Sequence, residues 1–174
     1  MDDNSDDVAR PFHRGLLVQP NCDGCPLQGE AIVPPEGNPN ATVAIVGDFP
    51  GYNEASQGRV FTATVGRLLD VLIHRAGAER SEFWITNAVL CRPKTTPQSN
   101  GELLNPDQVA RRAAQFCRSR LIGELQIIKP KAIIGFGSES VRSLYGSGAS
   151  LKGRRGGIHK ISLAGTDTSP GSKS

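Results

Sequence analysis

The chain has 174 residues, of which 37% are hydrophobic and 21% are charged, a composition typical of an ordered globular protein. It contains no apolar run long enough to span a bilayer, and its acidic first residues are unlike a secretion signal, so we expect a cytoplasmic protein with no membrane contact. The net charge of +3 does not by itself indicate binding to nucleic acid.

Hydrophobic periodicity predicts strands and helices that alternate along the chain. In order, the expected elements are a strand over 41–47, a helix over 64–78, a strand over 83–89, a long helix that begins at Pro106 and ends before Pro130, a strand over 131–137, a short helix over 138–146 and a fourth strand over 159–164. This order predicts a three-layer α/β/α fold around a mostly parallel, four-stranded central sheet. Ligands of such sheets bind at the carboxyl ends of the strands.

Each of the two longer helices carries an apolar stripe that we expect to be buried. In the first helix the stripe consists of Val65, Leu68, Leu69, Leu72, Ile73 and Ala76. In the long helix it consists of Val109, Ala113, Cys117, Leu121, Leu125 and Ile128. For the rest of the chain we expect a flexible acidic N-terminus over 1–20, a single domain over 21–163 with a polar loop over 94–105, and a disordered tail over 164–174,.

The four cysteines are the first candidate site. Cys22 and Cys25 are two residues apart, Cys91 follows the second predicted strand, and Cys117 lies on the stripe of the long helix. Structural disulfides are rare in the cytosol, whereas a C-x2-C pair with two further thiols at element ends is typical of a four-thiolate metal site. The spacing leaves zinc and an iron–sulfur cluster both open. Two buried free thiols beside a chance pair are the alternative.

The second candidate site is the loop VGDFPGYNEASQGRVF over 46–61, which continues directly from the first predicted strand. It contains three glycines, one proline and two carboxylates, Asp48 and Glu54. Glycines at the carboxyl end of a strand leave the backbone bare, which predicts that a ligand approaches it closely.

The motifs occur in a characteristic order. The stretch GDFPG-x2-E-x3-GRVF is preceded by C-x2-C and followed by ITNAVLCRP and a fourth cysteine. From Asn21 to about Lys160 the chain resembles the family 4 uracil-DNA glycosylases. The resemblance implies their fold and a base-excision repair enzyme that flips uracil, or a related modified base, out of DNA and hydrolyses its N-glycosidic bond. It also implies a monomer that carries a 4Fe-4S cluster on Cys22, Cys25, Cys91 and Cys117, with zinc as the alternative metal.

The resemblance implies roles for several residues near the bare loop. Phe61 would stack on the flipped base, and the Asn87 amide would pair with uracil O4 and N3–H, the edge that distinguishes uracil from cytosine. The backbone N–H groups of Gly47 and Gly51 would approach uracil O2, where negative charge develops as the bond breaks.

The carboxylates and the C-terminal part of the chain depart from the family pattern. Asp48 and Glu54 are the candidates to stabilise the oxocarbenium-like sugar or to orient the attacking water. However, Asp48 and Phe49 stand where the family has Glu and Ala, so Phe49 either reshapes the base pocket or faces the core. The chain also contains no His-Pro motif, which in the family helps to stabilise the uracil oxyanion. The alternative function is therefore a weakly active or inactive glycosylase-like iron–sulfur module that binds DNA, uracil, or a replication or repair partner.

Two groups of basic residues are candidates for contact with DNA phosphates. The first, which we expect to bind DNA, consists of Lys152, Arg154, Arg155, His159 and Lys160. The second lies on the long predicted helix and consists of Arg111, Arg112, Arg118 and Arg120. The second group is either a solvated helix face or a phosphate-contacting surface.

Overall fold

The computed structural model describes residues 15–98 and 100–163. Residues 1–14 of the predicted flexible N-terminus and the whole predicted tail over 164–174 lie outside the described residues. Val18, near the end of the predicted N-terminal segment, lies against Gly123 in the long helix.

The centre of the molecule is a four-stranded sheet with the strand order β1-β3-β2-β6. Its strands are β1 (Glu36–Gly37), β2 (Val43–Gly47), β3 (Trp84–Asn87) and β6 (Ala132–Gly135). β2 pairs in parallel with both β3 and β6, whereas β1 is antiparallel to β3. The prediction of a mostly parallel, four-stranded sheet is therefore confirmed, and the three parallel strands are each shorter than predicted.

The prediction of the fourth strand was wrong. Residues 159–163, the described part of the predicted strand over 159–164, form no strand, and β1 is the fourth strand instead. Ile161 and Leu163 pack against the core on one face of the sheet, and the Leu163 carbonyl accepts a hydrogen bond from the Gln126 side chain at 2.6 Å. The apolar residues here therefore belong to an irregular segment with one buried side.

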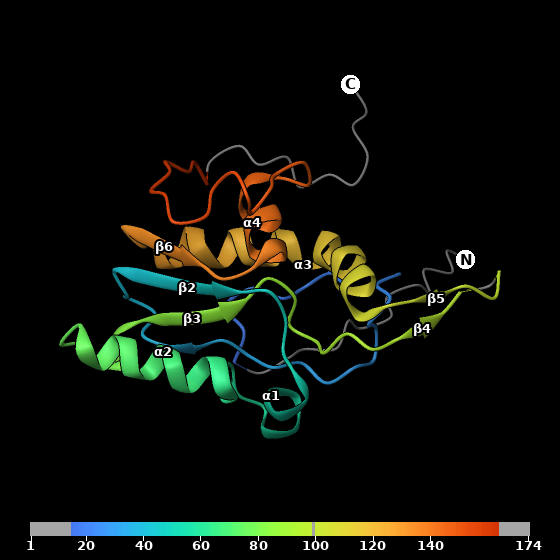
Figure 1. Ribbon diagram of the computed structural model, residues 1–174, viewed down its shortest axis with the longest axis horizontal. Helices are drawn as coiled ribbons and strands as arrows, with labels where there is room; N and C mark the ends of the chain where they lie inside the picture. Colours follow the sequence, from blue (N-terminus) through green and yellow to red (C-terminus); the bar gives the residue numbers. More distant parts are fainter. Residues whose placement is uncertain (1–14, 99, 164–174) are drawn as a thin grey trace, which may run out of the picture.

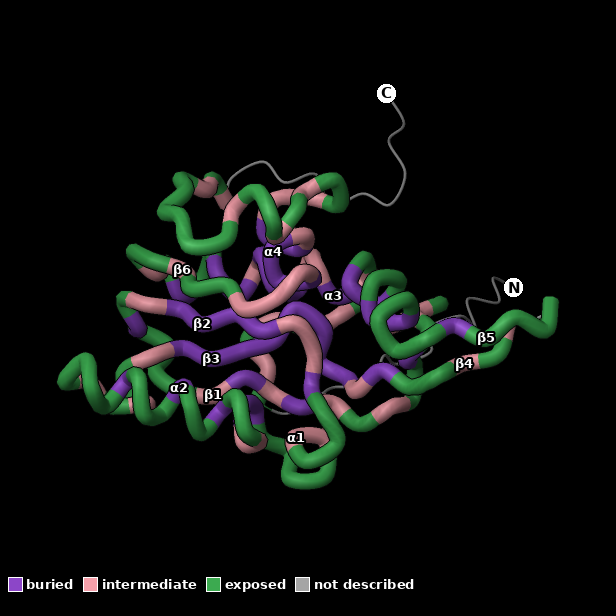
Figure 2. Tube along the Cα trace, viewed as in Figure 1, coloured by how far each residue is buried: buried purple, intermediate pink, exposed green. Residues whose placement is uncertain are grey.

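Helices cover both faces of the sheet (Figure 1). α3 (Pro106–Ile128) and α4 (Ser138–Tyr145) lie on one face, and α2 (Thr64–Arg75) lies on the other. The short helix α1 (Tyr52–Gln57) follows β2, and a 3-10 turn, η1 (Arg80–Glu82), leads into β3. The predicted three-layer arrangement is present, and β2 and β3 at its centre are the most continuously buried elements (Figure 2).

The long predicted helix is confirmed as α3, and its stripe is buried along its whole length. The helix begins after Asn105, whose side chain accepts a hydrogen bond from the Gln108 N–H, while the Gln108 side chain accepts one from the Asn105 N–H. This reciprocal cap satisfies two backbone groups of the first turn. The helix ends at Lys129, which adopts a left-handed backbone with φ of 52° immediately before Pro130.

The stripe predicted for the first helix is only partly buried. In α2, the buried residues are Gly66, Leu69 and Ile73, whereas Val65, Leu68 and Leu72 of the predicted stripe are exposed. Gly66 approaches its neighbour so closely that a Cβ atom there would lie 1.7 Å from the Phe61 carbonyl oxygen. The helix therefore contacts the rest of the protein along a narrower line than predicted, with a glycine at the closest point.

The predicted polar loop over 94–105 contains a small antiparallel hairpin of β4 (Thr96–Pro97) and β5 (Leu103–Leu104). The hairpin projects from the body of the protein on the side where β2 and β3 end (Figure 1). Leu104 is buried in one cluster with Cys91 and Cys117, so the base of the hairpin is anchored beside the cysteines.

Candidate active site

Three residues that are distant in the sequence meet where β2 and β3 end. Gly47 and Asn87 are paired in register as the last residues of the two parallel strands, and Phe61 lies beside them. A Cβ atom on Gly47 would lie 2.3 Å from Asn87 Oδ1 and 2.7 Å from Phe61 Cζ. Any larger residue would collide with both side chains, so this arrangement requires glycine at position 47. We call Gly47, Phe61 and Asn87 the strand-end cluster.

The amide of Asn87 is buried and only partly satisfied. The residue is 3% exposed, and its Nδ2 has no hydrogen-bond partner among the described residues. A buried N–H donor without an acceptor costs roughly 1–3 kcal/mol, and in native structures such a group needs an explanation. The Asn87 amide is therefore a candidate donor to a ligand that the cluster binds.

Phe61 is held in an unusual backbone conformation. Its φ of 50° is in the left-handed region, which is rare for an aromatic residue and costs of order 1–3 kcal/mol. The ring meets Phe136 edge-to-face at a centroid distance of 6.0 Å, and the Phe61 carbonyl lies against Gly66. Packing on both sides therefore aims the ring at Gly47.

Asp48 connects the end of β2 to the beginning of α4. Its two carboxylate oxygens accept hydrogen bonds from the backbone N–H groups of Ser138 at 3.0 Å and Ser140 at 2.8 Å. Burial raises the pKa of the Asp48 carboxyl, and the backbone N–H donors oppose this effect only in part. Asp48 therefore lies next to the strand-end cluster but serves as the acceptor for the first turn of α4.

Glu54 and Gly51 are hydrogen-bonded to each other. The Gly51 N–H donates to Glu54 Oε2 at 2.6 Å, which caps the first turn of α1. The Gly51 N–H that the sequence assigns to uracil O2 is thus already occupied. The same bond holds the carboxylate of Glu54 at the beginning of α1.

Phe49 packs on the side of the cysteines. It is half-buried against the hydrophobic cluster that contains Leu27, Val89 and Cys91. Of the two alternatives for this position, a reshaped base pocket or a core contact, the structure places the ring in the core contact.

Arg120 is a residue whose environment the sequence analysis misjudged. The sequence groups it with exposed arginines, but its side chain is fully buried and pairs with Glu124 at 2.7 Å. Its guanidinium donates to the carbonyl oxygens of Asn87 at 2.7 Å and Ala88 at 3.1 Å. Glu124 also accepts a hydrogen bond from Trp84 Nε1. Arg120 and Glu124 therefore support the end of β3 from the α3 side of the sheet.

The basic group over 152–160 lies apart from the strand-end cluster. The Arg154 guanidinium stacks over the Tyr145 ring at 4.5 Å, and the segment lies beside α4, on the opposite side of the sheet from α1 and α2 (Figure 1). Lys152, Arg155, His159 and Lys160 are exposed. Their contact with DNA stays a prediction.

The four cysteines come together from three parts of the chain. All four are free thiols; Cys91 and Cys117 are buried, and Cys22 and Cys25 are half-buried. Burial, with a smaller contribution from the neighbouring Cys117, raises the pKa of Cys25 to about 11 and that of Cys91 to about 12. The hydrophobic cluster shared by Cys25, Cys91 and Cys117 and the electrostatic effect of Cys117 on Cys22 indicate that the four side chains lie in one region.

The fit of this group to a metal centre rests on the chemistry of its donors. Among the described residues, no set of three or more His, Cys, Asp or Glu side chains is arranged to hold a metal ion. Nevertheless, four thiols with no disulfide, in a mostly apolar surrounding, are the donor set of a thiolate-bound metal or cluster,. The residues present therefore fit such a group in type and number.

Comparisons with known proteins place the chain in a family. Residues 34–170 match the uracil DNA glycosylase superfamily. A type-4 uracil-DNA glycosylase of Pyrobaculum aerophilum is 36% identical over 137 residues, which cover 78% of this chain and 63% of that protein. Type-4 uracil-DNA glycosylases of Sulfurisphaera tokodaii and Thermotoga maritima are 35% and 31% identical, over 65% and 69% of this chain and 47% and 58% of theirs. The chain belongs to the uracil DNA glycosylase superfamily.

The matches thus span about half to somewhat less than two thirds of these relatives' lengths. Across the part of the chain that the structure describes, none of the helices has both the length and the apolar character needed to cross a membrane.

Proposed function

We propose that this protein binds uracil in DNA and hydrolyses the bond between the base and its sugar. The observation that carries the proposal is the strand-end cluster. The buried Asn87 side chain has its Oδ1 beside Gly47 and the Phe61 ring, and its Nδ2 has no hydrogen-bond partner among the described residues. The similarity to proteins named type-4 uracil-DNA glycosylases supports the same activity.

The Asn87 amide supplies the selectivity for uracil. Its Nδ2–H donates to uracil O4, and its Oδ1 accepts from uracil N3–H. Cytosine presents the opposite pattern, an amino donor and an unprotonated ring nitrogen, so both contacts would be mismatched. A site built to hydrogen-bond one polar edge rejects the other strongly because buried groups would be left unpaired.

The base must reach a cluster that is closed in this structure. Asn87 is 3% exposed and Phe61 is 8% exposed, so the loop over 48–61 has to move when the flipped base enters. The left-handed backbone of Phe61 supports this step, because strained residues are common where a structure switches. Phe61 would then lie on the face of the base.

Hydrolysis adds water across the C1′–N1 bond. The bonding electrons leave with the uracil, the water oxygen bonds to C1′, and its proton is released to the base or to solvent. An ionised Asp48 has acceptor capacity beyond the two backbone N–H groups that it binds,. Asp48 is therefore our candidate to orient the water and to stabilise the positive charge on the sugar.

A binding module without efficient catalysis is the second candidate function. One observation favours it: Asp48 and Glu54 both already accept backbone hydrogen bonds, and the Gly51 N–H donates to Glu54. On this alternative, the strand-end cluster recognises uracil in DNA, and neither carboxylate activates water.

We propose further that Cys22, Cys25, Cys91 and Cys117 hold a 4Fe-4S cluster, with zinc as the alternative. Bound to the four thiolates, the cluster would serve to tie segments together rather than to act on the substrate. Cys91 follows Asn87 by four residues, so this group would also stabilise the segment that leaves the strand-end cluster. The raised pKa values of Cys25 and Cys91 mean that binding must displace protons from these thiols.

The test is base release by the purified chain from oligonucleotides that contain one uracil, hypoxanthine or cytosine, followed by cleavage of abasic sites. We expect cleavage at uracil and none at cytosine. Asn87→Ala should lower the rate by about 10²–10³-fold, and no hydrogen bond of Nδ2 is lost, because this atom has no partner among the described residues. Retained affinity for uracil-containing DNA without any base release would favour the binding module.

A further inference from the structure

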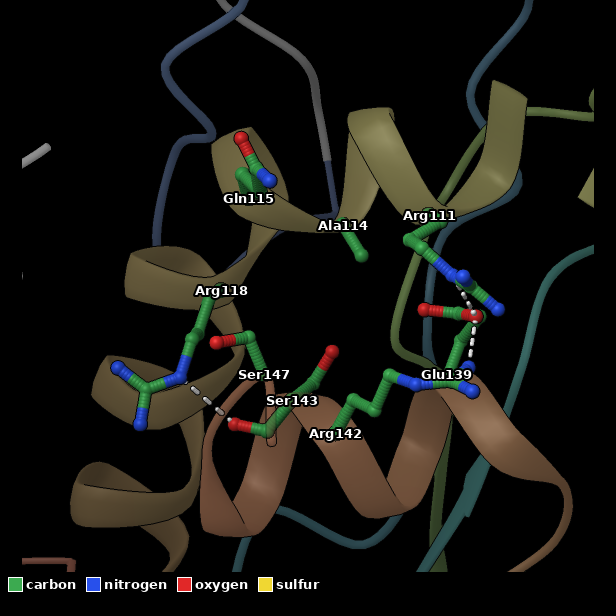
Figure 3. Close-up of a pocket in the computed structure, with 8 residues that line it drawn as sticks. All are labelled: Arg111, Ala114, Gln115, Arg118, Glu139, Arg142, Ser143 and Ser147. Carbon is green, nitrogen blue, oxygen red and sulfur yellow. Dashed lines mark hydrogen bonds and ion pairs between the residues drawn. The ribbon is translucent and has the colours of Figure 1, made fainter. Parts of the chain in front are cut away.

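A hollow lies between α3 and α4, and none of its lining residues belongs to the strand-end cluster (Figure 3). Its volume is about 120 Å³, and its charged lining residues are Arg111, Arg118, Arg142 and Glu139. Three arginines against one glutamate leave two net positive charges on this small surface. We call it the α3–α4 pocket.

The guanidinium groups of the pocket are incompletely neutralised. Arg142 forms an ion pair with Glu139 within α4. Arg111 approaches the same carboxylate only to 3.8 Å, and its side chain is 61% exposed. Arg118 uses its Nε to bind the Ser143 carbonyl at 3.0 Å. Since two arginines share one carboxylate, the pocket can bind a further anion.

Ser143 provides independent evidence for a ligand. The residue is 2% exposed, and its hydroxyl has no hydrogen-bond partner among the described residues. Figure 3 shows this side chain directed from α4 into the pocket, toward Ala114 of α3. A buried, unpaired hydroxyl is unfavourable, and a ligand oxygen in the pocket would satisfy it.

We propose that the α3–α4 pocket binds a phosphate group. Phosphate carries enough acceptor oxygens to engage the Arg111 and Arg142 guanidinium groups and the Ser143 hydroxyl together, and arginine is well suited to such recognition. The assignment of phosphate itself is independent of the glycosylase proposal. The further choice of a nucleic acid as its source rests on the proposed function.

The location of the pocket makes this source reasonable. The first turn of α4, which supplies Glu139 to the pocket, also donates the N–H groups of Ser138 and Ser140 to Asp48. One helix turn thus joins the pocket to Asp48, which directly follows Gly47 of the strand-end cluster. Either a terminal phosphate or an internal phosphodiester of the bound strand would present the required chemistry.

The first experiment measures inorganic phosphate binding to the full chain by titration of NMR resonances. Arg111→Gln and Ser143→Ala should each weaken binding about tenfold, the effect of one hydrogen bond to a charged group. The matched control is Arg112→Gln, because Arg112 is the next residue, is exposed and binds Gln98 rather than the pocket. Ser143→Ala should not lower stability, since its hydroxyl has no hydrogen-bond partner in the part of the chain that the structure describes. Absence of phosphate binding, or equal binding by wild type and both pocket variants, would overturn the proposal.

The second experiment distinguishes the sources with single-stranded oligonucleotides that lack uracil, with and without a 5′-phosphate. If the pocket binds a terminal phosphate, Arg111→Gln should lower the affinity for the phosphorylated strand only. If it binds an internal phosphate, Arg111→Gln should lower the affinity for both strands, and the slope of log K against log salt should fall by about 0.7. Unchanged affinity for both strands would overturn the nucleic acid as the source, even in a protein that still releases uracil.

Discussion

At the scale of single residues, the proposed base recognition depends on how closely Gly47, Phe61 and Asn87 approach one another. Gly47 leaves the space in which the amide and the ring converge, and no side chain among the described residues satisfies the Asn87 Nδ2. The register of β2 and β3 sets Gly47 against Asn87, and packing against Phe136 and Gly66 places Phe61.

Gly47→Ala tests this geometry directly. The new methyl group would lie 2.3 Å from Asn87 Oδ1, so the amide must move, and a displacement of this size costs about 10²-fold in rate. Uracil release under single-turnover conditions is the measurement. Gly148→Ala is the control, because its added Cβ would meet no atom within 4 Å and should leave the rate unchanged. Equal rates for both variants would contradict the geometry.

Asp48→Asn tests the ionisation of the buried carboxyl. Because burial raises the Asp48 pKa, folding favours the protonated form. The stability that the protonated Asp48 carboxyl contributes is therefore fully present below the unfolded-state pKa of about 4. This stability is lost as pH rises through the folded-state pKa. Relative to wild type, Asp48→Asn should thus be more stable at pH 7 than at pH 4.5 in urea unfolding. A difference that is constant with pH, or of opposite sign, would refute the burial argument.

The sequence predicted these residues unevenly. Gly47, Phe61 and Asn87 could be singled out because motif order and strand ends place them near the ligand edge of the sheet. The sequence could not predict which way Phe49 points or which acceptor the Gly51 N–H binds, because both depend on the neighbour that packs against each group. Phe49 packs against the hydrophobic cluster that contains Cys91, and the Gly51 N–H caps α1, although both residues belong to the same loop.

At the scale of elements, α3 supports β3 through a buried ion pair. Arg120 and Glu124 are both fully buried, and their hydrogen bonds reach the Asn87 carbonyl and Trp84. The sequence signal was weak: an arginine and a glutamate four residues apart, next to the apolar stripe. Charge patterning normally indicates a solvated face, and only the packing of α3 on the sheet reveals the exception.

Arg120→Met should lower the free energy of unfolding by about 3–5 kcal/mol, because it leaves the Glu124 carboxylate buried without its cation. Adding Glu124→Gln should recover part of this loss, since the amide carries no charge and can still accept from Trp84 Nε1. Denaturant unfolding of the single and double variants measures both effects. A double variant less stable than Arg120→Met alone would show that the charge of Glu124 is not what makes the single change costly.

At the scale of the whole molecule, the layers were predictable and one edge of the sheet was not. The apolar segments at 43–47 and 84–87 have the pattern of buried parallel strands, and 132–135 is apolar as well, although β6 is mostly exposed,. The alternating helices determine the layers,. β1 has only two residues, too few for a periodic pattern. The segment over 159–163 was mistaken for a strand because a one-sided irregular segment has the same sparse apolar residues.

The four cysteines belong to the N-terminal segment, the segment after β3, and α3. We expect protein purified without oxygen to be brown and to contain an iron–sulfur cluster. Cys91→Ser should lose the colour because one of the four thiolate ligands is removed. It should unfold at lower temperature because the segment that follows Asn87 is no longer tied to the cluster,. Visible absorption, iron analysis and thermal unfolding are the measurements. A colourless wild-type protein with one bound zinc would contradict the cluster assignment.

The most direct test of the central claim is the NMR signal of the Asn87 side-chain amide during titration with free uracil. We expect saturating uracil to move this signal strongly, because Nδ2 gains its missing acceptor, and cytosine to leave the signal in place. Gly47→Ala should abolish the response. An Asn87 signal that stays unchanged at saturating uracil would contradict the claim that the strand-end cluster is the base-binding site.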